Sequence, residues 1–152
     1  MRINFIKSSK KKEILVKLEE QFGISDLPYL LIESGKEKIR GFSGHLSKEE
    51  INEISLILNI EIMGLYLLKQ EQDLRLSLDA TTLLKEQITK NIIDISDAQL
   101  QEWLRGRDLD IKTPKGTIII KNKDDLIGCG KSNGEKIFNY LPKDRRLKNK
   151  IN

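Results

Sequence analysis

The sequence predicts an α+β protein in two parts, a small α/β domain over residues 1–72 and a compact, partly closed β-barrel domain over residues 73–152. Three observations support this fold class. A chain of 152 residues is long enough for two small domains that share an interface. Helix-like and strand-like patterns alternate in the first part. The second part has short strands separated by glycine-rich turns, with one or two short helices.

The first part is expected to form two helices and four strands. The first helix begins at Ser8 or Ser9, either of which can cap it, and ends at Gly23. The second opens with Ser47 and Glu50 at the spacing of a capping box. The apolar positions that these helices should bury are Ile14, Leu15, Leu18, Phe22, Ile51, Ile54, Ile57 and Leu58. The expected strands are residues 2–6, 27–34, 38–42 and 60–68, of which the middle two form a hairpin.

A charged, turn-prone segment over residues 69–73 marks the predicted boundary between the two parts. Beyond it, one short helix is expected over residues 79–87, and another begins at a Ser96 cap and ends near Leu104. The apolar face of this last helix contains Ala98, Leu100, Trp103 and Leu104. The expected strands of the second part are residues 74–77, 91–95, 117–121, 126–131 and 136–141.

The positive charge of the chain is concentrated at its carboxyl end. Residues 1–110 carry 16 Lys/Arg against 19 Asp/Glu, whereas residues 111–152 carry 11 against 4. Positive charge on one segment favours binding to a polyanion, because binding releases the counterions that the polyanion had condensed. A solvated lysine-rich tail is the alternative interpretation.

Several protein classes are excluded by composition. With one cysteine, Cys129, and one histidine, His45, no disulfide framework and no Cys/His metal site can form, so we expect no zinc. No secretory signal is visible, and the longest apolar stretch, residues 54–68, is interrupted by polar residues and glycine. We therefore expect a soluble, cytoplasmic protein that does not associate with a membrane.

Catalytic motifs are not found in the sequence. The segment from Gly128 to Ser132 ends like a phosphate-binding P-loop, but Asp125 stands where that motif requires its first glycine. Between two glycines of a predicted strand, Cys129 is expected to be a small buried hydrophobe rather than a nucleophile. His45 is expected to be a loop residue with local hydrogen bonds. The chain is therefore predicted not to be an enzyme and to carry no cofactor.

Two short segments predict a binding surface. An amide, an aromatic ring and three cations converge in Asn139-Tyr140-Leu141-Pro142-Lys143-Asp144-Arg145-Arg146. Cations neutralise phosphates, and an aromatic ring can stack on an unpaired base. The segment Arg105-Gly106-Arg107 places a glycine between two cations at a helix end, for which an ordinary helix C-cap is the alternative interpretation. Trp103 is expected in the core rather than at a base.

Three runs of the sequence carry a resemblance to a known family, namely LRLSLDATTLL, NIIDISDAQLQEWLRGRDL and GTIIIKNKDDLIGCGKSNGEKIFNYLPKDRRL. They resemble the PUA-like domain at the C-terminus of Sun-family RNA cytosine-5 methyltransferases, and most of all the stand-alone ribosome-biogenesis proteins related to it. PUA domains, named for pseudouridine synthases and archaeosine transglycosylases, are compact pseudo-β-barrels that bind structured RNA. The resemblance implies that fold and that ligand for residues 73–152.

On this basis the segment from Arg105 to Arg107 matches the glycine loop of the family, and the segment from Lys131 to Arg146 contains its basic C-terminal motif. Phosphate contacts are expected from the cations of this motif and from Lys148, and base or sugar contacts from Asn139 and Tyr140. We expect the cations to gather on one exposed patch. The full set of candidate RNA-binding residues is Arg105, Gly106, Arg107, Lys131, Lys136, Asn139, Tyr140, Lys143, Arg145, Arg146 and Lys148.

The chain departs from these methyltransferases because it has neither the length of their Rossmann-like domain nor their Pro-Cys nucleophile; Gly128 precedes its only cysteine. The leading hypothesis is a non-catalytic protein that binds structured rRNA or tRNA in ribosome biogenesis or RNA modification. The alternative is an RNA-recognition subunit that acts in trans with a separate RNA cytosine-5 methyltransferase. A protein partner is then that enzyme or a ribosome-assembly factor. A small hydrolase or nuclease would need an acid/base cluster that the sequence does not supply.

Overall fold

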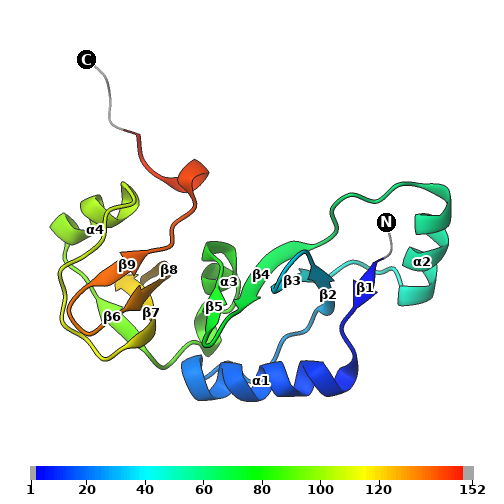
Figure 1. The fold of residues 1–152 in the computed structure, drawn as a ribbon, viewed down its shortest axis with the longest axis horizontal. Helices are drawn as coiled ribbons and strands as arrows, with labels where there is room; N and C mark the ends of the chain where they lie inside the picture. The colour runs from blue at the N-terminus through cyan, green and yellow to red at the C-terminus, as the bar shows by residue number, and fades with distance from the viewer. Residues whose placement is uncertain (1–2, 149–152) are drawn as a thin grey trace.

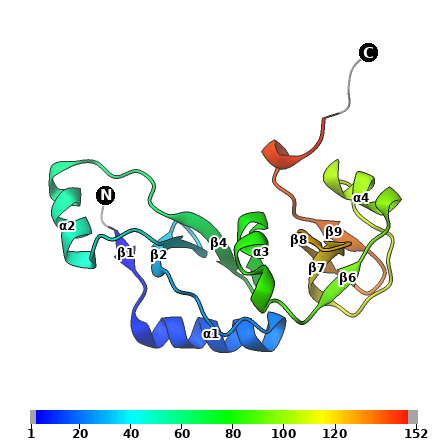
Figure 2. The same ribbon diagram turned by 180° about the vertical axis from the view of Figure 1, so that it is seen from behind.

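The computed structural model describes residues 3–148 and contains two β-sheets that lie side by side along the long axis of the molecule (Figure 1). The view from behind shows the same arrangement, with α2 (Lys48–Ile57) and α4 (Asp97–Leu104) at opposite ends (Figure 2). Helices and sheets occur in both parts, which confirms the predicted α+β class.

The first sheet is antiparallel throughout, and its strands follow one another in chain order. Helix α1 (Ser8–Phe22) runs along this sheet and buries Ile14, Leu18 and Phe22 (Figure 1). The predicted hairpin is present. The strands are β1 (Asn4–Phe5), β2 (Leu30–Ser34), β3 (Lys38–Phe42), β4 (Leu65–Gln70) and β5 (Leu74–Leu76). In the expected strand 2–6, Arg2 lies outside the described residues.

The second sheet has the order β6-β7-β8-β9. Its first pair is parallel, and α4 lies in the connection between the two strands, as a parallel crossover requires; the other pairs are antiparallel. Between the two sheets the chain forms α3 (Leu78–Leu83) and the short 3-10 helix η1 (Lys85–Gln87), where a single helix was expected. The strands are β6 (Ile92–Asp94), β7 (Gly116–Asn122), β8 (Asp125–Ser132) and β9 (Ile137–Asn139), and the 3-10 helix η2 (Lys143–Arg145) follows them.

Two apolar clusters form the core, and β7 contributes to both. Ile119 belongs to the larger cluster together with α1 and the first sheet, whereas Ile118 and Ile120 belong to the smaller one around Trp103. Successive side chains of a strand point to opposite faces, so an uninterrupted isoleucine run is what a strand buried on both faces requires. The larger cluster also contains Cys129 of β8, and it therefore joins the two sheets.

The helix ends follow the expected chemistry except at α1. Both predicted serine caps are present, and Ser47 with Glu50 forms the full capping box. Gly23 ends α1 in the left-handed conformation, with φ +83°. The predicted cap at Ser8 or Ser9 is wrong, because α1 begins one residue earlier than a serine cap allows. Its N-cap is Lys7, whose side chain makes no capping hydrogen bond.

Predicted burial on α2 is wrong at its C-terminal end. Ile51 is buried, but Ile57 is 83% exposed and Leu58 is 61% exposed. Ile57 stands six residues after Ile51, which at 3.6 residues per turn places it about 120° around the helix from the buried face. The strand expected over residues 60–68 begins only at Leu65, after Gly64 turns the chain with φ +82°. On α4, Ala98 is exposed although it was expected on the apolar face.

The predicted domain boundary between residues 72 and 73 falls in the turn that joins β4 to β5. Leu74 and Leu76 of β5 belong to the larger core cluster, and the second sheet starts at Ile92. The boundary remains a prediction. Within residues 3–148, no helix combines the length and the hydrophobicity that crossing a membrane requires.

Candidate nucleic-acid interface

A pocket of about 210 Å³ opens where the edge of the first sheet meets the C-terminal segment. The charged and aromatic side chains of its wall come from both parts of the chain. Its inner lining is apolar and includes Leu76, Trp103 and Cys129. Its charged and tyrosine lining residues include Lys38, Tyr66, Arg75, Asp79, Tyr140 and Arg145.

Arg75 lines this pocket beside the two tyrosines. Its guanidinium carbon lies 4.1 Å from the centroid of the Tyr140 ring, a cation–π distance. The positive charge of Arg75 also acts on Tyr66, which lines the same pocket. Burial raises the pKa of Tyr66, and the Arg75 charge opposes that rise. Lys38 lies over the Tyr66 ring at 5.5 Å, so two cations contact two tyrosines across the sheet edge.

Glu71 balances part of this positive charge. Its carboxylate is 3.0 Å from Lys69 and 3.7 Å from Arg75. Burial acts to raise the pKa of Glu71, but the Lys69 hydrogen bond and the charges of Arg75, Lys69 and Lys131 outweigh it and lower the pKa. Glu71 is therefore ionised at neutral pH and fixes the guanidinium beside Tyr140.

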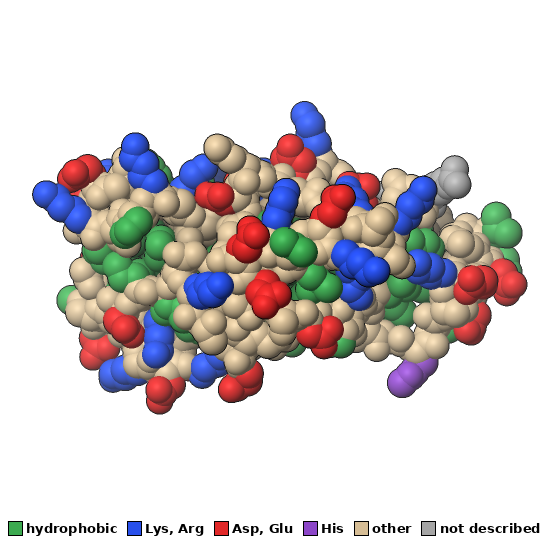
Figure 3. All heavy atoms as spheres, turned by 90° about the horizontal axis from the view of Figure 1, so that it is seen from below, with side chains coloured by type: hydrophobic (Ala, Val, Ile, Leu, Met, Phe, Trp, Pro, Cys, Tyr) green, Lys and Arg blue, Asp and Glu red, His purple; other side chains and the backbone are tan. Residues whose placement is uncertain are grey.

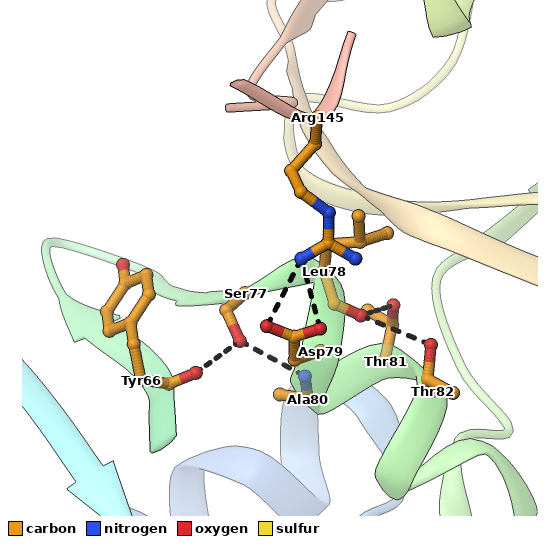
Figure 4. Close-up of polar contacts among 8 residues, drawn as sticks. All are labelled: Tyr66, Ser77, Leu78, Asp79, Ala80, Thr81, Thr82 and Arg145. Carbon is orange, nitrogen blue, oxygen red and sulfur yellow. Dashed lines mark hydrogen bonds and ion pairs between the residues drawn. The ribbon is translucent and has the colours of Figure 1, made fainter. Parts of the chain in front are cut away.

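Arg145 lines the pocket from the C-terminal segment and points toward Asp79 (Figure 4). It donates to both carboxylate oxygens of Asp79, at 3.2 and 3.4 Å. Asp79 stands in the first turn of α3, which is capped by Ser77; the Ser77 hydroxyl accepts from the Ala80 amide at 3.1 Å and donates to the Tyr66 carbonyl at 2.6 Å (Figure 4). Both partners of the ion pair are about 40–45% exposed, so the pair stabilises the fold by only about 0–1 kcal/mol.

The segment Arg105-Gly106-Arg107 forms the end of α4. Gly106 has φ +85°, and a Cβ placed on it would collide with Nε of Arg146. Arg105 and Arg107 both pair with Glu102, at 4.0 and 2.7 Å. The segment therefore forms the helix C-cap that was the alternative interpretation of its sequence. Its contact with RNA remains a prediction.

Asn139 is engaged within the protein. Its amide nitrogen donates to the carbonyls of Trp103 and Arg107, at 2.8 and 3.0 Å, and its side-chain oxygen accepts from the Leu141 amide at 2.7 Å. Arg146 is held similarly, with Nε donating to the Leu141 carbonyl at 3.0 Å. These side chains shape the C-terminal segment around α4, and contact of Asn139 with RNA remains a prediction.

The predicted cations lie at several places along the second sheet and the C-terminal segment, and their gathering on one exposed patch remains a prediction. Tyr140 and Arg145 line the pocket, while Arg146 lies against Gly106 at the end of α4. Lys131 lines a separate depression of about 430 Å³ beside Phe138, its cross-strand partner on β9. Lys143 and Lys148 are exposed on the C-terminal segment, and Lys136 is half-buried just before β9. On the face that is seen from the α1 side, positive and negative side chains are interspersed along the whole length (Figure 3).

Sequence reasoning missed the contribution of the first sheet to the site. Lys38, Tyr66 and Arg75 were not selected, although they supply one wall of the pocket. A signal for Arg75 was available, because it begins the Arg-Leu-Ser triplet in the first run that carries the resemblance. Nothing comparable marks Lys38 or Tyr66, which reach the site only through strand pairing.

Two residues proved structural, as expected. Trp103 is fully buried, and its indole nitrogen donates to the Ile127 carbonyl at 2.9 Å. The Cys129 thiol donates to the Leu76 carbonyl at 3.0 Å, and burial raises its pKa to about 12, so it is not a reactive thiolate at neutral pH. His45 is an exposed loop residue. In the described part of the chain, no group of three or more His, Cys, Asp and Glu side chains is placed to hold a metal ion.

Comparison with known proteins identifies the second part of the chain. Residues 90–147 match the family model described as the methyltransferase RsmF PUA domain. This segment is similar to PUA domains of that type. The ribosomal RNA small subunit methyltransferase F of Vibrio campbellii is 36% identical over 62 residues, which cover 36% of this chain and 13% of that enzyme. The resemblance found in the sequence is thereby confirmed for the PUA domain.

A solved structure extends the similarity to both sheets. The conserved PUA domain protein from Thermoplasma acidophilum superimposes with a TM-score of 0.58, covering 91% of this chain and 93% of that chain at 17% identity. This likeness shows the fold, including the predicted pseudo-β-barrel. PUA domains typically bind RNA, and the PUA domain of this chain is related to that of an rRNA methyltransferase.

Proposed function

We propose that this chain is a non-catalytic, cytoplasmic RNA-binding protein that recognises structured rRNA or tRNA in ribosome biogenesis or RNA modification. The observation that carries the proposal is the match of residues 90–147 to a methyltransferase PUA domain. The charge distribution supports it, because the last 42 residues carry 11 Lys/Arg against 4 Asp/Glu. No part of the match extends to a methyltransferase domain, so the proposal concerns recognition rather than chemistry.

The proposed contact surface runs from the pocket along the C-terminal segment. Tyr140 provides an aromatic ring, and Arg145, Lys143 and Lys148 provide positive charge. The pairs that Arg105 and Arg107 make with Glu102 are exposed enough to exchange for contacts with phosphate. Lys131 and Lys136 would contact a longer RNA that crosses the second sheet.

Binding should be tested by a titration of labelled rRNA fragments and tRNA at several salt concentrations. The variant Lys143→Ala/Lys148→Ala removes two exposed cations without touching the hydrogen bonds of Asn139 or Arg146. Its affinity should fall, and its salt slope should decrease by about 0.7–0.9 for each phosphate that is no longer neutralised. As a matched control, Lys12→Ala/Lys17→Ala removes the same charge from the exposed side of α1. Equal affinities for the two double variants would contradict the proposed surface.

The related function of an RNA-recognition subunit acting in trans is favoured by one observation. The matched domain belongs to the methyltransferase RsmF type, and it represents only 13% of the methyltransferase aligned with it. Affinity purification of the chain separates the two functions. Recovery of an RNA cytosine-5 methyltransferase in stoichiometric amount supports the subunit, and recovery of pre-ribosomal particles without that enzyme supports the assembly factor.

A further inference from the structure

The pocket between the two sheets has a composition that the RNA-binding surface alone does not explain. Its described charged lining residues are Lys38, Arg75, Arg145 and Asp79, and Asp79 is already neutralised by Arg145. The remaining positive charge, on Lys38 and on Arg75, which shares the Glu71 carboxylate with Lys69, favours an anionic group. Because Lys38 and Arg75 belong to the first sheet, this anion site is not part of the matched PUA segment.

The wall below these cations is suited to a flat ring. Tyr66 and Tyr140 face the cations, and the depth of the pocket is lined by Leu76, Trp103 and Cys129. The pocket thus combines cations with aromatic and apolar side chains. This combination suits a ligand that has a ring at one end and an anionic group at the other. The volume of about 210 Å³ lies below the ~300–1,000 Å³ of sites for drug-sized ligands, so it holds one ring system rather than a longer segment.

A β-bulge shapes the back of this pocket. Ile119 pairs with Cys129 and Lys121 pairs with Leu126, so two residues of β8, Ile127 and Gly128, stand opposite one residue of β7. Gly128 has φ +78° and lines the pocket. Bulges bend a strand and redirect its backbone beside functional sites. Here the Ile127 carbonyl is turned to accept from Trp103, which fixes the wall.

The cation that would meet the anion is held in place before any ligand arrives. Arg75 is fixed by the Tyr140 ring at 4.1 Å and by Glu71 at 3.7 Å. A planar guanidinium with a fixed orientation recognises phosphate oxygens in pairs, and less side-chain entropy is lost on binding.

We infer that this pocket binds a single unstacked nucleotide, with its base against the tyrosines and its phosphate at Arg75 and Lys38. The inference rests on the proposed function, since the nucleotide would be an extruded residue of the bound RNA. A free nucleoside monophosphate has the same chemistry. In RNA, the pocket would select sites that contain an unpaired nucleotide.

The chain has one tryptophan, Trp103, and it lines the pocket, so its fluorescence reports binding directly. The full chain is titrated with an RNA hairpin that carries one bulged nucleotide, with the same hairpin fully paired, and with the four 5′-monophosphates. Tyr140→Ala should weaken binding of the bulged hairpin about 5- to 150-fold, the range for losing one stacked base, and should weaken binding of the paired hairpin much less. Arg75→Met should act in the same direction, and Tyr140→Phe and Arg75→Lys should recover part of the binding.

The outcomes separate this inference from the proposed function. Lost discrimination between the hairpins in Tyr140→Ala and Arg75→Met, with recovery in the conservative variants, supports an extruded nucleotide. Binding of monophosphates that these variants abolish, without discrimination between hairpins, supports the pocket with a free nucleotide as its ligand. Wild-type behaviour of Tyr140→Ala and Arg75→Met toward every probe overturns the inference, while the Lys143→Ala/Lys148→Ala result still decides the proposed function. If no RNA binds the wild-type chain, the proposed function fails first.

Discussion

The contact between Gly106 and Arg146 links two segments that the sequence marked separately. We predict that Gly106→Ala destabilises the protein by about 1 kcal/mol more than Gly35→Ala. Both glycines have positive φ, but a Cβ at Gly35 meets nothing within 4 Å, whereas one at Gly106 displaces the Arg146 side chain. The additional loss in the free energy of unfolding comes from breaking the hydrogen bond from Arg146 to the Leu141 carbonyl, which contributes about 0.5–1.5 kcal/mol. Urea unfolding of both variants measures it, and equal losses would show that the contact contributes nothing.

Cys129 makes stability depend on pH in the alkaline range. Burial raises the pKa of its thiol from the ordinary 9.0 to about 12, so the folded chain holds the proton more tightly than the unfolded chain does. The contribution of the protonated Cys129 thiol to the free energy of unfolding is complete below about pH 9. It is lost as the pH rises from about 9 to about 12. We expect the free energy of unfolding to fall over that range and to fall less in Cys129→Ala. Rapid alkylation of the native thiol at pH 8 would contradict its burial.

Residue roles could be predicted where the neighbours in sequence determine them. Trp103 on an apolar helix stripe and Cys129 between strand glycines were placed in the core correctly. The role of Asn139 could not be predicted, because its partners are carbonyls 32 and 36 residues earlier in the chain. Within the protein this amide fastens the C-terminal segment to α4, and its contact with RNA stays a prediction.

At the scale of the element, α2 offers a direct comparison of two isoleucines. Ile51 is 1% exposed and Ile57 is 83% exposed. We predict that Ile51→Ala lowers the free energy of unfolding by about 2–4 kcal/mol, because it removes buried methyl groups and leaves a cavity. Ile57→Ala should change it by no more than about 0.5 kcal/mol. Thermal unfolding of the two variants checks this, and similar losses would mean that both faces of α2 are covered.

The elements were predictable where local chemistry sets them. The capping serines Ser47 and Ser96 and the terminating Gly23 mark helix ends, and the β2–β3 hairpin surrounds a recognisable turn. The start of β4 was not predictable, since the apolar residues before Gly64 read as a buried strand although Ile62 is 72% exposed. Hydrophobicity alone does not distinguish a strand from an exposed loop when no partner strand is known.

At the scale of the whole molecule, the larger core cluster makes the two parts interdependent. Ile119 and Cys129 belong to the matched PUA segment, but Leu76, Ala80 and α1 complete their cluster. We predict that a fragment of residues 90–148 exposes this apolar surface, binds a hydrophobic dye and unfolds with lower cooperativity than the full chain. Calorimetry and dye fluorescence compare the two. A fragment that melts as sharply as the full chain would show that the second sheet folds independently.

The shared core also has a kinetic consequence for ligand capture. Close-packed side chains join the two sheets, so the sheets resist rotating away from each other. The geometry of the pocket between them is therefore established as the chain folds. Association in a stopped-flow experiment should then follow a single bimolecular phase without a slower closure step. Differences between tight and weak RNAs should appear chiefly in their residence times.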